Sequence, residues 1–353
     1  HLRARLQAGY LLGRLGDPRF IPQEIKGVKV ILPTMVPVPA GRYRIGSQSD
    51  EEEAYDDERP ATWVELPEFS IGKWPVTNAE YACFMAAGGY ENEEYWVGEM
   101  GRRWLKGEEV AGGQLKTYLD NINMLRANPG WQDRVKDVWT PQTIETYEYL
   151  LELSAEQAIA ELSKFLTNKS RRQPAYWDDP QYNNPSQPVV GVTWFEAQAY
   201  CAWLTALCGK TFRLPSEAEW EAAGRGSTAS ANRIYPWGAG WEPARANTIE
   251  GRVLKPSPVG AYAAAGGVGP YGAEDQAGNV WNWTSSLYRP YPYDPGQSEQ
   301  PEAQGERVLR GGSWINTRWN ARCASRFGNV PGDFLDVSGF RVLSPGILPD
   351  SGC

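Results

Sequence analysis

The 353-residue sequence predicts an α+β fold with a few helices, short strands and much ordered loop. Gly and Pro are frequent, with 37 and 27 copies, so segments with regular periodicity are short. Trp and Tyr occur 16 and 18 times, and each can hold a loop in place because it buries a large ring and offers a polar group. Sharp helix-start signals nevertheless occur at three places, which predicts helices embedded in irregular structure.

The three helix starts share the Ser/Thr-x-x-Glu pattern of a capping box, in which both side chains bind the first free backbone N–H groups. The boxes are Thr77-Asn-Ala-Glu80, Thr193-Trp-Phe-Glu196 and Ser216-Glu-Ala-Glu219. Glycine favours helix ends, and we expect these helices to stop at Gly88, Gly209 and Gly224.

Other segments flank these helices. Residues 1–16 form an amphipathic pattern, which predicts a helix that either docks on the main domain or ends an upstream module. Residues 28–46 alternate with prolines, as short strands and turns do. Residues 97–175 contain two helical patterns, Leu115 to Leu125 and Ile144 to Leu166, and predict a helical insertion. The acidic run 50–58 predicts a solvated loop.

Composition excludes several classes of protein. The single His, at position 1, leaves no histidine cluster for a metal and no Ser-His-Asp triad. A net charge of −8 argues against a nucleic-acid partner. No apolar run approaches the roughly 20 residues that span a bilayer, so we expect no membrane partner. Five cysteines without a CxxC motif predict no disulfide framework, and we expect a cytoplasmic protein.

A series of short motifs follows the chain in a fixed order. They are Met35 to Gly46, Glu58 to Pro60, Leu66-Pro67, Trp74 to Tyr81, Pro188 to Trp194, Ala199 to Trp203, Phe212 to Trp220, Tyr235 to Gly238, Ala246 to Thr248, Asp275 to Trp283, Arg307 to Trp314 and Gly339 to Val342. Together they resemble the formylglycine-generating-enzyme, or sulfatase-modifying-factor, domain. The resemblance implies a C-type-lectin-like fold of that subtype, with little regular secondary structure. We expect an N-terminal helix and linker over 1–33, this domain over 34–345 with its insertion, and a tail over 346–353.

The resemblance also implies chemistry that this sequence lacks. Enzymes of the family bind copper through a cysteine pair just after the Arg-Gly-Gly-Ser motif, and cuprous ion needs such soft thiolates. The first cysteine position is Asn316 here, the second is missing, and Cys323 matches a structural position. A second branch holds iron with three His, which this chain does not contain. We therefore expect a protein that is not an enzyme.

The tail, about 314–342, resembles the variable proteins of diversity-generating retroelements, which carry mutable residues on this fold. The resemblance implies a fixed framework of Trp314, Arg322, Ala324, Arg326, Pro331 and Gly339 to Arg341. Such systems mutate Asn codons and cannot yield Lys, Glu, Gln, Met or Trp. None of the first four types occurs from Ile315 to Ser338, and the one Trp there, Trp319, would be fixed.

The predicted ligand-binding positions lie between the framework residues. They are Ile315, Asn316, Thr317, Asn320, Ser325, Phe327, Asn329, Val330, Asp333, Phe334, Leu335, Asp336 and Val337. Exposed Phe and Leu in a charge-poor patch favour a protein ligand. The alternative is that Phe327, Val330, Phe334 and Leu335 are core residues of the last strands.

A structural calcium ion is a further expectation from the resemblance, although no cofactor is required. Family enzymes hold calcium near the segments that match Asn247-Thr248 and Asn279. Asn282 replaces a family Glu, which removes one carboxylate from the donors that calcium prefers. The alternative is that both Asn side chains cap local turns.

These observations predict a non-catalytic receptor or display protein whose C-terminal surface is diversified by a retroelement. Two alternatives stay open. One is a copper-dependent oxidase of the formylglycine-generating type. The other is a fixed accessory domain that regulates an attached effector, which an upstream effector domain would supply.

Overall fold

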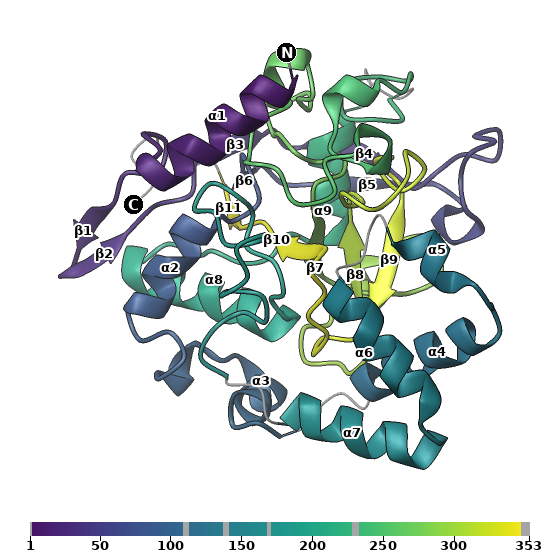
Figure 1. Ribbon diagram of the computed structural model, residues 1–353. Coiled ribbons are helices and arrows are strands. Elements are labelled where there is room, and N and C mark those ends of the chain that lie inside the picture. The colour runs from purple at the N-terminus through teal and green to yellow at the C-terminus, as the bar shows by residue number, and fades with distance from the viewer. Residues whose placement is uncertain (1, 109–112, 137–140, 168–170, 228–232, 347–353) are drawn as a thin grey trace.

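A computed structural model describes residues 2–108, 113–136, 141–167, 171–227 and 233–346, and it confirms the α+β class (Figure 1). The strands are short and lie in small sheets. Two of these sheets are two-stranded, β1 (Gln23–Ile25) with β2 (Val28–Val30), and β4 (Gly41–Ile45) with β5 (Thr62–Leu66). Strands occur inside the predicted 28–46 segment, as expected.

Two larger sheets include strands from the C-terminal part of the chain. A three-stranded sheet has the order β11 (Leu343–Pro345), β6 (Phe69–Gly72), β3 (Met35–Val38), and all its pairs are antiparallel. A four-stranded sheet has the order β10 (Ser338–Phe340), β7 (Trp281–Leu287), β8 (Arg307–Arg310), β9 (Arg326–Asn329). β10 runs parallel to β7, and the other pairs are antiparallel. β9 is thus an edge strand of its sheet.

The three predicted capping boxes are confirmed. They begin α2 (Asn78–Ala86), α8 (Trp194–Cys208) and α9 (Glu217–Arg225), and in each the Ser or Thr oxygen accepts from the N–H of the Glu three residues on. α8 ends at Gly209, whose φ of 68° is left-handed, as predicted. The predicted end of α9 at Gly224 is wrong. Gly224 lies inside the helix against Gln276 and Cys323, and Gly226, with a φ of 87°, ends it.

The N-terminal helix α1 (Leu2–Leu15) docks on the main domain. Its Tyr10 hydroxyl donates to the Pro256 carbonyl at 2.8 Å, and the Tyr10 carbonyl accepts from the Asn184 amide at 2.9 Å. Gly13 lies so close to Asn184 that an added Cβ would stand 2.2 Å from its oxygen. A larger residue at this point of the helix would have to displace the side chains of Asn184 and Ser186.

The predicted insertion consists of helices. They are α3 (Gly98–Leu105), α4 (Gly113–Arg126), α5 (Trp131–Val135), α6 (Pro141–Glu152) and α7 (Ala155–Thr167). The second predicted helical pattern, 144–166, is divided between α6 and α7. Ser154 and Gln157 form a reciprocal capping box there, which starts α7. Ile122, Leu150, Ala158 and Leu162 form a core of its own for the insertion.

The main core is rich in aromatic side chains. Tyr81 of α2 stacks on Tyr200 of α8 at 5.7 Å, and Phe340 of β10 meets both rings edge-on. Trp203 and Trp283 are also buried in this core. The C-terminal strand β10 is therefore part of the central packing. Within the described ranges, no helix has the length and apolar character needed to cross a membrane.

α10 (Pro295–Ser298) follows β7 and is a single turn. The acidic run 50–58 is largely exposed, as predicted, but its last residue is not. Glu58 is fully buried at the end of the 3₁₀ turn Asp56–Glu58. Glu58 can be buried because its carboxylate binds Arg322 of the C-terminal segment, and a buried charge needs such a partner.

Candidate functional site

The C-terminal segment 314–342 begins directly after β8 and contains β9 and β10. Two glycines make the turn that leads into it. Gly311 and Gly312 have φ values of 100° and 72°, and a Cβ on Gly312 would lie 2.8 Å from the Asn320 carbonyl. Only glycine fits this turn without strain. The turn brings the chain from the centre of the sheet to the surface region around residues 315–320.

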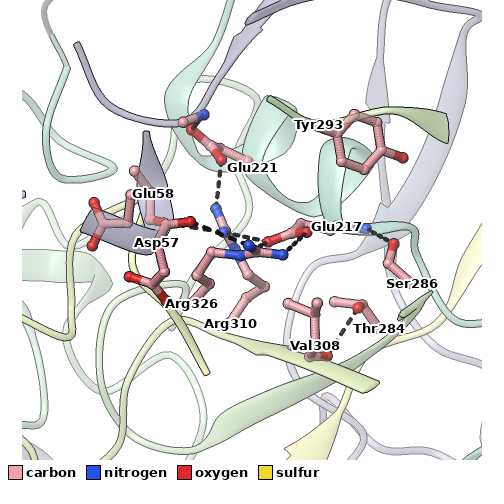
Figure 2. Close-up of polar contacts among 12 residues, drawn as sticks. Asp57, Glu58, Glu217, Glu221, Thr284, Ser286, Tyr293, Val308, Arg310 and Arg326 are labelled. Atoms are coloured by element: carbon pink, nitrogen blue, oxygen red, sulfur yellow. Dashed lines mark hydrogen bonds and ion pairs between the residues drawn. The ribbon is translucent and has the colours of Figure 1, made fainter. Parts of the chain in front are cut away.

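A buried network of charges fixes β8 and β9 to helix α9 (Figure 2). Arg310 donates to Glu217 at 2.9 Å and to Glu221 at 2.6 Å. Arg326 grips Glu217 with two bonds of 2.8 Å each. Arg225 completes the network through Glu221. All these side chains are buried, and the nearby carboxylates raise the pKa of Arg310 and of Arg326.

Two more framework arginines tie the segment to distant parts of the chain. Arg322 makes two 2.6 Å bonds to Glu58. Arg341 donates to the carbonyl groups of Gly72, Lys73 and Asp275 and to the side chain of Asn282. Burial lowers the pKa of Arg341 to about 10. The guanidinium groups thus bind backbone and carboxylate oxygens in the interior, where planar, multiple donors are most effective.

The structure separates the framework residues from many of the predicted ligand-binding positions. Trp314, Arg322, Ala324, Arg326, Pro331 and Gly339 to Arg341 are all buried. Thr317 and Phe327 are exposed, Phe327 by 44%. The half-buried positions are Ile315, Asn316, Asn320, Val330, Leu335 and Asp336.

Five predicted positions are buried, and this corrects the expectation that they lie on the surface. They are Ser325, Asn329, Asp333, Phe334 and Val337. Asn329 donates to Asp333 at 2.8 Å, and Asp333 also accepts from the Phe334 N–H at 2.9 Å, so these polar groups satisfy each other inside a turn. Phe334 is only 5% exposed. The alternative of a core residue therefore holds for Phe334 and not for Phe327.

Some half-buried positions are already engaged. Asn316 accepts from the Ser313 hydroxyl at 2.6 Å, and Asp336 accepts from the Tyr182 hydroxyl at 2.8 Å. Burial raises the pKa of the Asp336 carboxyl. Two further residues of the segment, Arg318 and Trp319, are half-buried, with the guanidinium 4.2 Å from the ring centre. The sequence predicts a fixed Trp319 and leaves Arg318 out of the ligand-binding positions, although its place between Thr317 and Asn320 is a signal that could have marked Arg318.

The cysteines do not form a copper site within the described residues. Cys323 is fully buried, and burial raises the pKa of its thiol to about 12, so it stays a neutral thiol at pH 7. No group of three His, Cys, Asp or Glu side chains suited to a metal occurs among the residues that the structure describes. Cys83 and Cys201 are free thiols, whereas Cys208 is disulfide-bonded, which differs from the expectation of reduced cysteines.

The expected calcium donors form a buried polar niche. Asn279 is held with a φ of 67°, and its side-chain oxygen accepts from the Asn247 amide at 3.2 Å and from the Ser257 N–H at 2.8 Å. The side-chain oxygens of Asn247, Thr248 and Ser257 are buried without a hydrogen-bond partner. All these oxygens belong to uncharged side chains, and the Asn279 oxygen already accepts two hydrogen bonds. The niche therefore fits a water molecule better than calcium, which takes six to eight oxygen ligands and prefers carboxylates among them.

Comparisons with known proteins agree with this geometry. Residues 22–345 match the family model of the Sulfatase-modifying factor enzyme 1-like domain. Hercynine oxygenase of Mycolicibacterium smegmatis is 33% identical over 293 residues, which cover 80% of this chain and 54% of that protein. The inactive C-alpha-formylglycine-generating enzyme 2 of Mus musculus is 32% identical over 328 residues, covering 88% of this chain and 86% of that one. The chain thus spans about half the length of the hercynine oxygenase.

One solved structure shows the same fold at low identity. Treponema denticola variable protein 1 superposes with a TM-score of 0.54 and 17% identity, covering 92% of this chain and 98% of the other. This likeness confirms the predicted C-type-lectin-like fold of the formylglycine-generating-enzyme subtype.

The prediction that the chain is not an enzyme is corrected by the names of its relatives. Hercynine oxygenase is an enzyme, and so is the formylglycine-generating enzyme of Bos taurus, which is 28% identical over 94% of this chain and 80% of its own length. The relatives also include the inactive C-alpha-formylglycine-generating enzyme 2 of Mus musculus. Catalysis as a class therefore stays open for this chain.

Proposed function

The chain belongs to the family of the Sulfatase-modifying factor enzyme 1-like domain, and we propose that within this family it binds a protein ligand through its C-terminal segment. The observation that carries the proposal is the separation of roles along 314–342. Framework side chains are buried and bound to distant elements, whereas Thr317 and Phe327 reach solvent. Such an arrangement lets surface residues change while the backbone stays in place.

The chemistry of the exposed positions favours a protein ligand. Phe327 lies on the edge strand β9, and its ring packs 5.9 Å from Trp281. An aromatic side chain that packs on a buried ring and is itself partly exposed is a suitable anchor for a protein interface. Thr317 and the Arg318–Trp319 pair add polar and aromatic contacts. Tyr, Trp, Phe and Arg are the residues that protein interfaces enrich.

We further propose that a retroelement diversifies these exposed positions. The composition of 315–338, without Lys, Glu, Gln or Met, supports this proposal. Sequencing the locus in sister isolates tests it. We expect changes to concentrate at Thr317, Phe327 and the half-buried positions, at Asn codons of a nearby template repeat. Changes spread evenly over the gene would reject diversification.

A second experiment tests tolerance directly. Libraries that randomise either Thr317 and Phe327 or Arg322 and Arg326 are expressed and sorted for folded protein. We expect most members of the first library to fold and very few of the second, because only the second loses buried ion pairs. Equal survival of both libraries would contradict the proposed division of roles.

A fixed accessory domain is the second candidate function. The hercynine oxygenase relative is almost twice as long as the region that matches this chain, so domains of this family occur inside longer proteins. Under this reading the chain would regulate an attached effector through an invariant surface. The same locus sequencing separates the two readings, because an accessory surface would show no excess of changes at Thr317 and Phe327.

A copper-dependent oxidase is the third candidate, and the formylglycine-generating enzyme among the relatives favours it. Copper titration combined with a formylglycine assay on a Cys-containing peptide measures this activity. The buried, neutral thiol of Cys323 leads us to expect no turnover that depends on it. Turnover that disappears in Cys323→Ser would establish the oxidase and displace the binding proposal.

A further inference from the structure

A cavity of about 530 Å³ lies on a part of the molecule that the proposed ligand surface does not use. Its walls come from β5, α8, the start of α9 and the stretch after β7. Val64, Leu66, Phe212 and Leu214 make much of the lining apolar. None of the predicted ligand-binding positions lines it. The volume falls within the range of about 300–1,000 Å³ that is typical of small-molecule sites.

The polar feature of this cavity is the carboxylate of Glu299. One of its oxygens accepts from the hydroxyls of Tyr293, at 2.9 Å, and of Ser286. The other oxygen accepts from the Ser285 hydroxyl at 2.9 Å. An ionised carboxylate offers about four acceptor positions, and the described residues fill three of them, which leaves one on the oxygen that faces Ser285.

Glu299 has no ion-pair partner within the described part of the chain. The cavity does contain Arg213, but its guanidinium is closed by two 2.7 Å bonds to Glu219. Arg307, which is nearby in the sheet, donates to the carbonyl groups of Ser285, Gln300, Pro301 and Ala303 instead. Burial raises the pKa of the Glu299 carboxyl, as expected for a negative charge that lacks compensation.

A second, smaller cavity of about 200 Å³ adjoins the first. The two share Val97, Gln198 and Pro301 in their linings, so they lie side by side, and together they are called the groove. Glu99 and Glu302, both exposed, line the smaller part, and neither forms an ion pair within the described residues. The groove therefore combines apolar walls, the half-buried carboxylate of Glu299 and an acidic outer end.

We propose that this groove binds an aliphatic diamine through one of its primary ammonium groups. The apolar walls suit a methylene stem, and the free acceptor position of Glu299 suits an ammonium N–H. The second charge of a diamine would lie toward Glu99 and Glu302. This inference does not rest on the proposed function, because the two sites share no predicted ligand-binding residue.

The test uses the intact chain, with cadaverine as the charged probe and 1,5-pentanediol as its uncharged counterpart. Isothermal titration calorimetry measures the affinity of the protein for each of the two compounds. We expect saturable binding of cadaverine and at least about tenfold weaker binding of the diol. Equal affinities would show an apolar groove without ammonium recognition and would overturn the proposal. So would the absence of cadaverine binding at millimolar concentration.

Two matched variants locate the charge that matters. Glu299→Gln and Glu302→Gln each remove one negative charge from the groove, but only the first changes the carboxylate that the hydroxyls of Ser285, Ser286 and Tyr293 bind. We expect cadaverine affinity to fall at least about tenfold in Glu299→Gln and less than about threefold in Glu302→Gln. Equal losses would reduce the effect to general electrostatics and reject a specific site.

A third variant keeps the test decisive if Glu299→Gln does not fold. Val97 is exposed, lines both parts of the groove, and can be enlarged without entering the core. We expect Val97→Trp to block the groove and abolish cadaverine binding, with an unchanged melting temperature. Undiminished binding in folded Val97→Trp would place the probe elsewhere and refute the assignment.

Discussion

The buried carboxylate of Glu217 offers the sharpest test of how the C-terminal segment is held. In the wild type it accepts three hydrogen bonds from two arginines, one from Arg310 at 2.9 Å and two from Arg326 at 2.8 Å. The change Glu217→Gln keeps the size and removes the charge. Its amide nitrogen would also present N–H groups to an arginine donor, which is repulsive.

The magnitude follows from these contacts. Each hydrogen bond to a charged group contributes about 1.5–3 kcal/mol, and breaking a buried ion pair from one side costs about 3–5 kcal/mol. Arg310 retains Glu221, and Arg326 retains the carbonyl groups of Asp57 and Arg289. We therefore expect Glu217→Gln to lower the free energy of unfolding by about 3–5 kcal/mol, out of a total of about 5–15 kcal/mol for a typical domain.

Urea denaturation followed by tryptophan fluorescence measures this loss. Glu161→Gln serves as the control, because Glu161 pairs with Lys164 on the exposed side of α7, where an ion pair adds little. We expect no measurable change there. A loss below about 1 kcal/mol in Glu217→Gln would refute the reasoning, because it would show that the buried network contributes no net stability.

Three further outcomes follow. Phe334→Ser should destabilise the protein by about 3–5 kcal/mol, because the ring is buried, whereas Phe327→Ser should cost less than about 1 kcal/mol in urea denaturation; equal costs would contradict the assigned exposures. Burial raises the pKa of Glu80 to about 7, above its ordinary value of 4.5, so the native state binds the extra proton between these values. Stability should therefore fall as pH rises from about 4.5 to 7, and Glu80→Gln should flatten this fall in melting curves; an unchanged slope would count against it. EDTA and added calcium should leave the melting temperature unchanged, because the niche at Asn247 and Asn279 lacks a carboxylate, and a calcium-dependent rise would show that the niche does hold the ion.

Local signals in the sequence predicted much of the fold. The capping boxes at Thr77, Thr193 and Ser216 depend on residues three apart, and all three were found where the pattern placed them. The break at Ser154 was missed, although it uses the same reciprocal bonding. The apolar residues keep the same spacing through α6 and into α7, so the hydrophobic pattern alone does not show that one helix ends and another begins.

Long-range partners could not be predicted in the same way. Arg322 and Arg326 were expected to be framework residues, but their partners Glu58 and Glu217 lie 264 and 109 residues away. Glu58 belongs to an acidic run that is typical of a solvated loop. Its burial depends on a guanidinium that only the folded chain brings close. For the same reason the sequence could not divide the exposed Phe327 from the buried Phe334.

The groove around Glu299 illustrates the same limit at the level of a site. Its lining comes from β5, α8, α9 and the stretch after β7, and no short motif includes them all. Ser285, Ser286 and Tyr293 are ordinary residues in sequence. They mark a site only in the folded chain, where the hydroxyls of all three donate to the carboxylate of Glu299. A site assembled from separate elements is therefore recognised only in the folded structure.

The position of Arg341 has a consequence for how the chain reaches its native state. Its guanidinium joins carbonyl groups of residues 72–73 and 274–275, and β11, just after it, completes the sheet of β3 and β6. Ribosomes make the chain from its N-terminus, so strands near residues 35 and 70 emerge long before their partner. Contacts of such large sequence separation form slowly. The core therefore cannot close before residue 341 and β11 have left the ribosome, and a chain interrupted before residue 341 would leave β6 without the strand that completes its sheet.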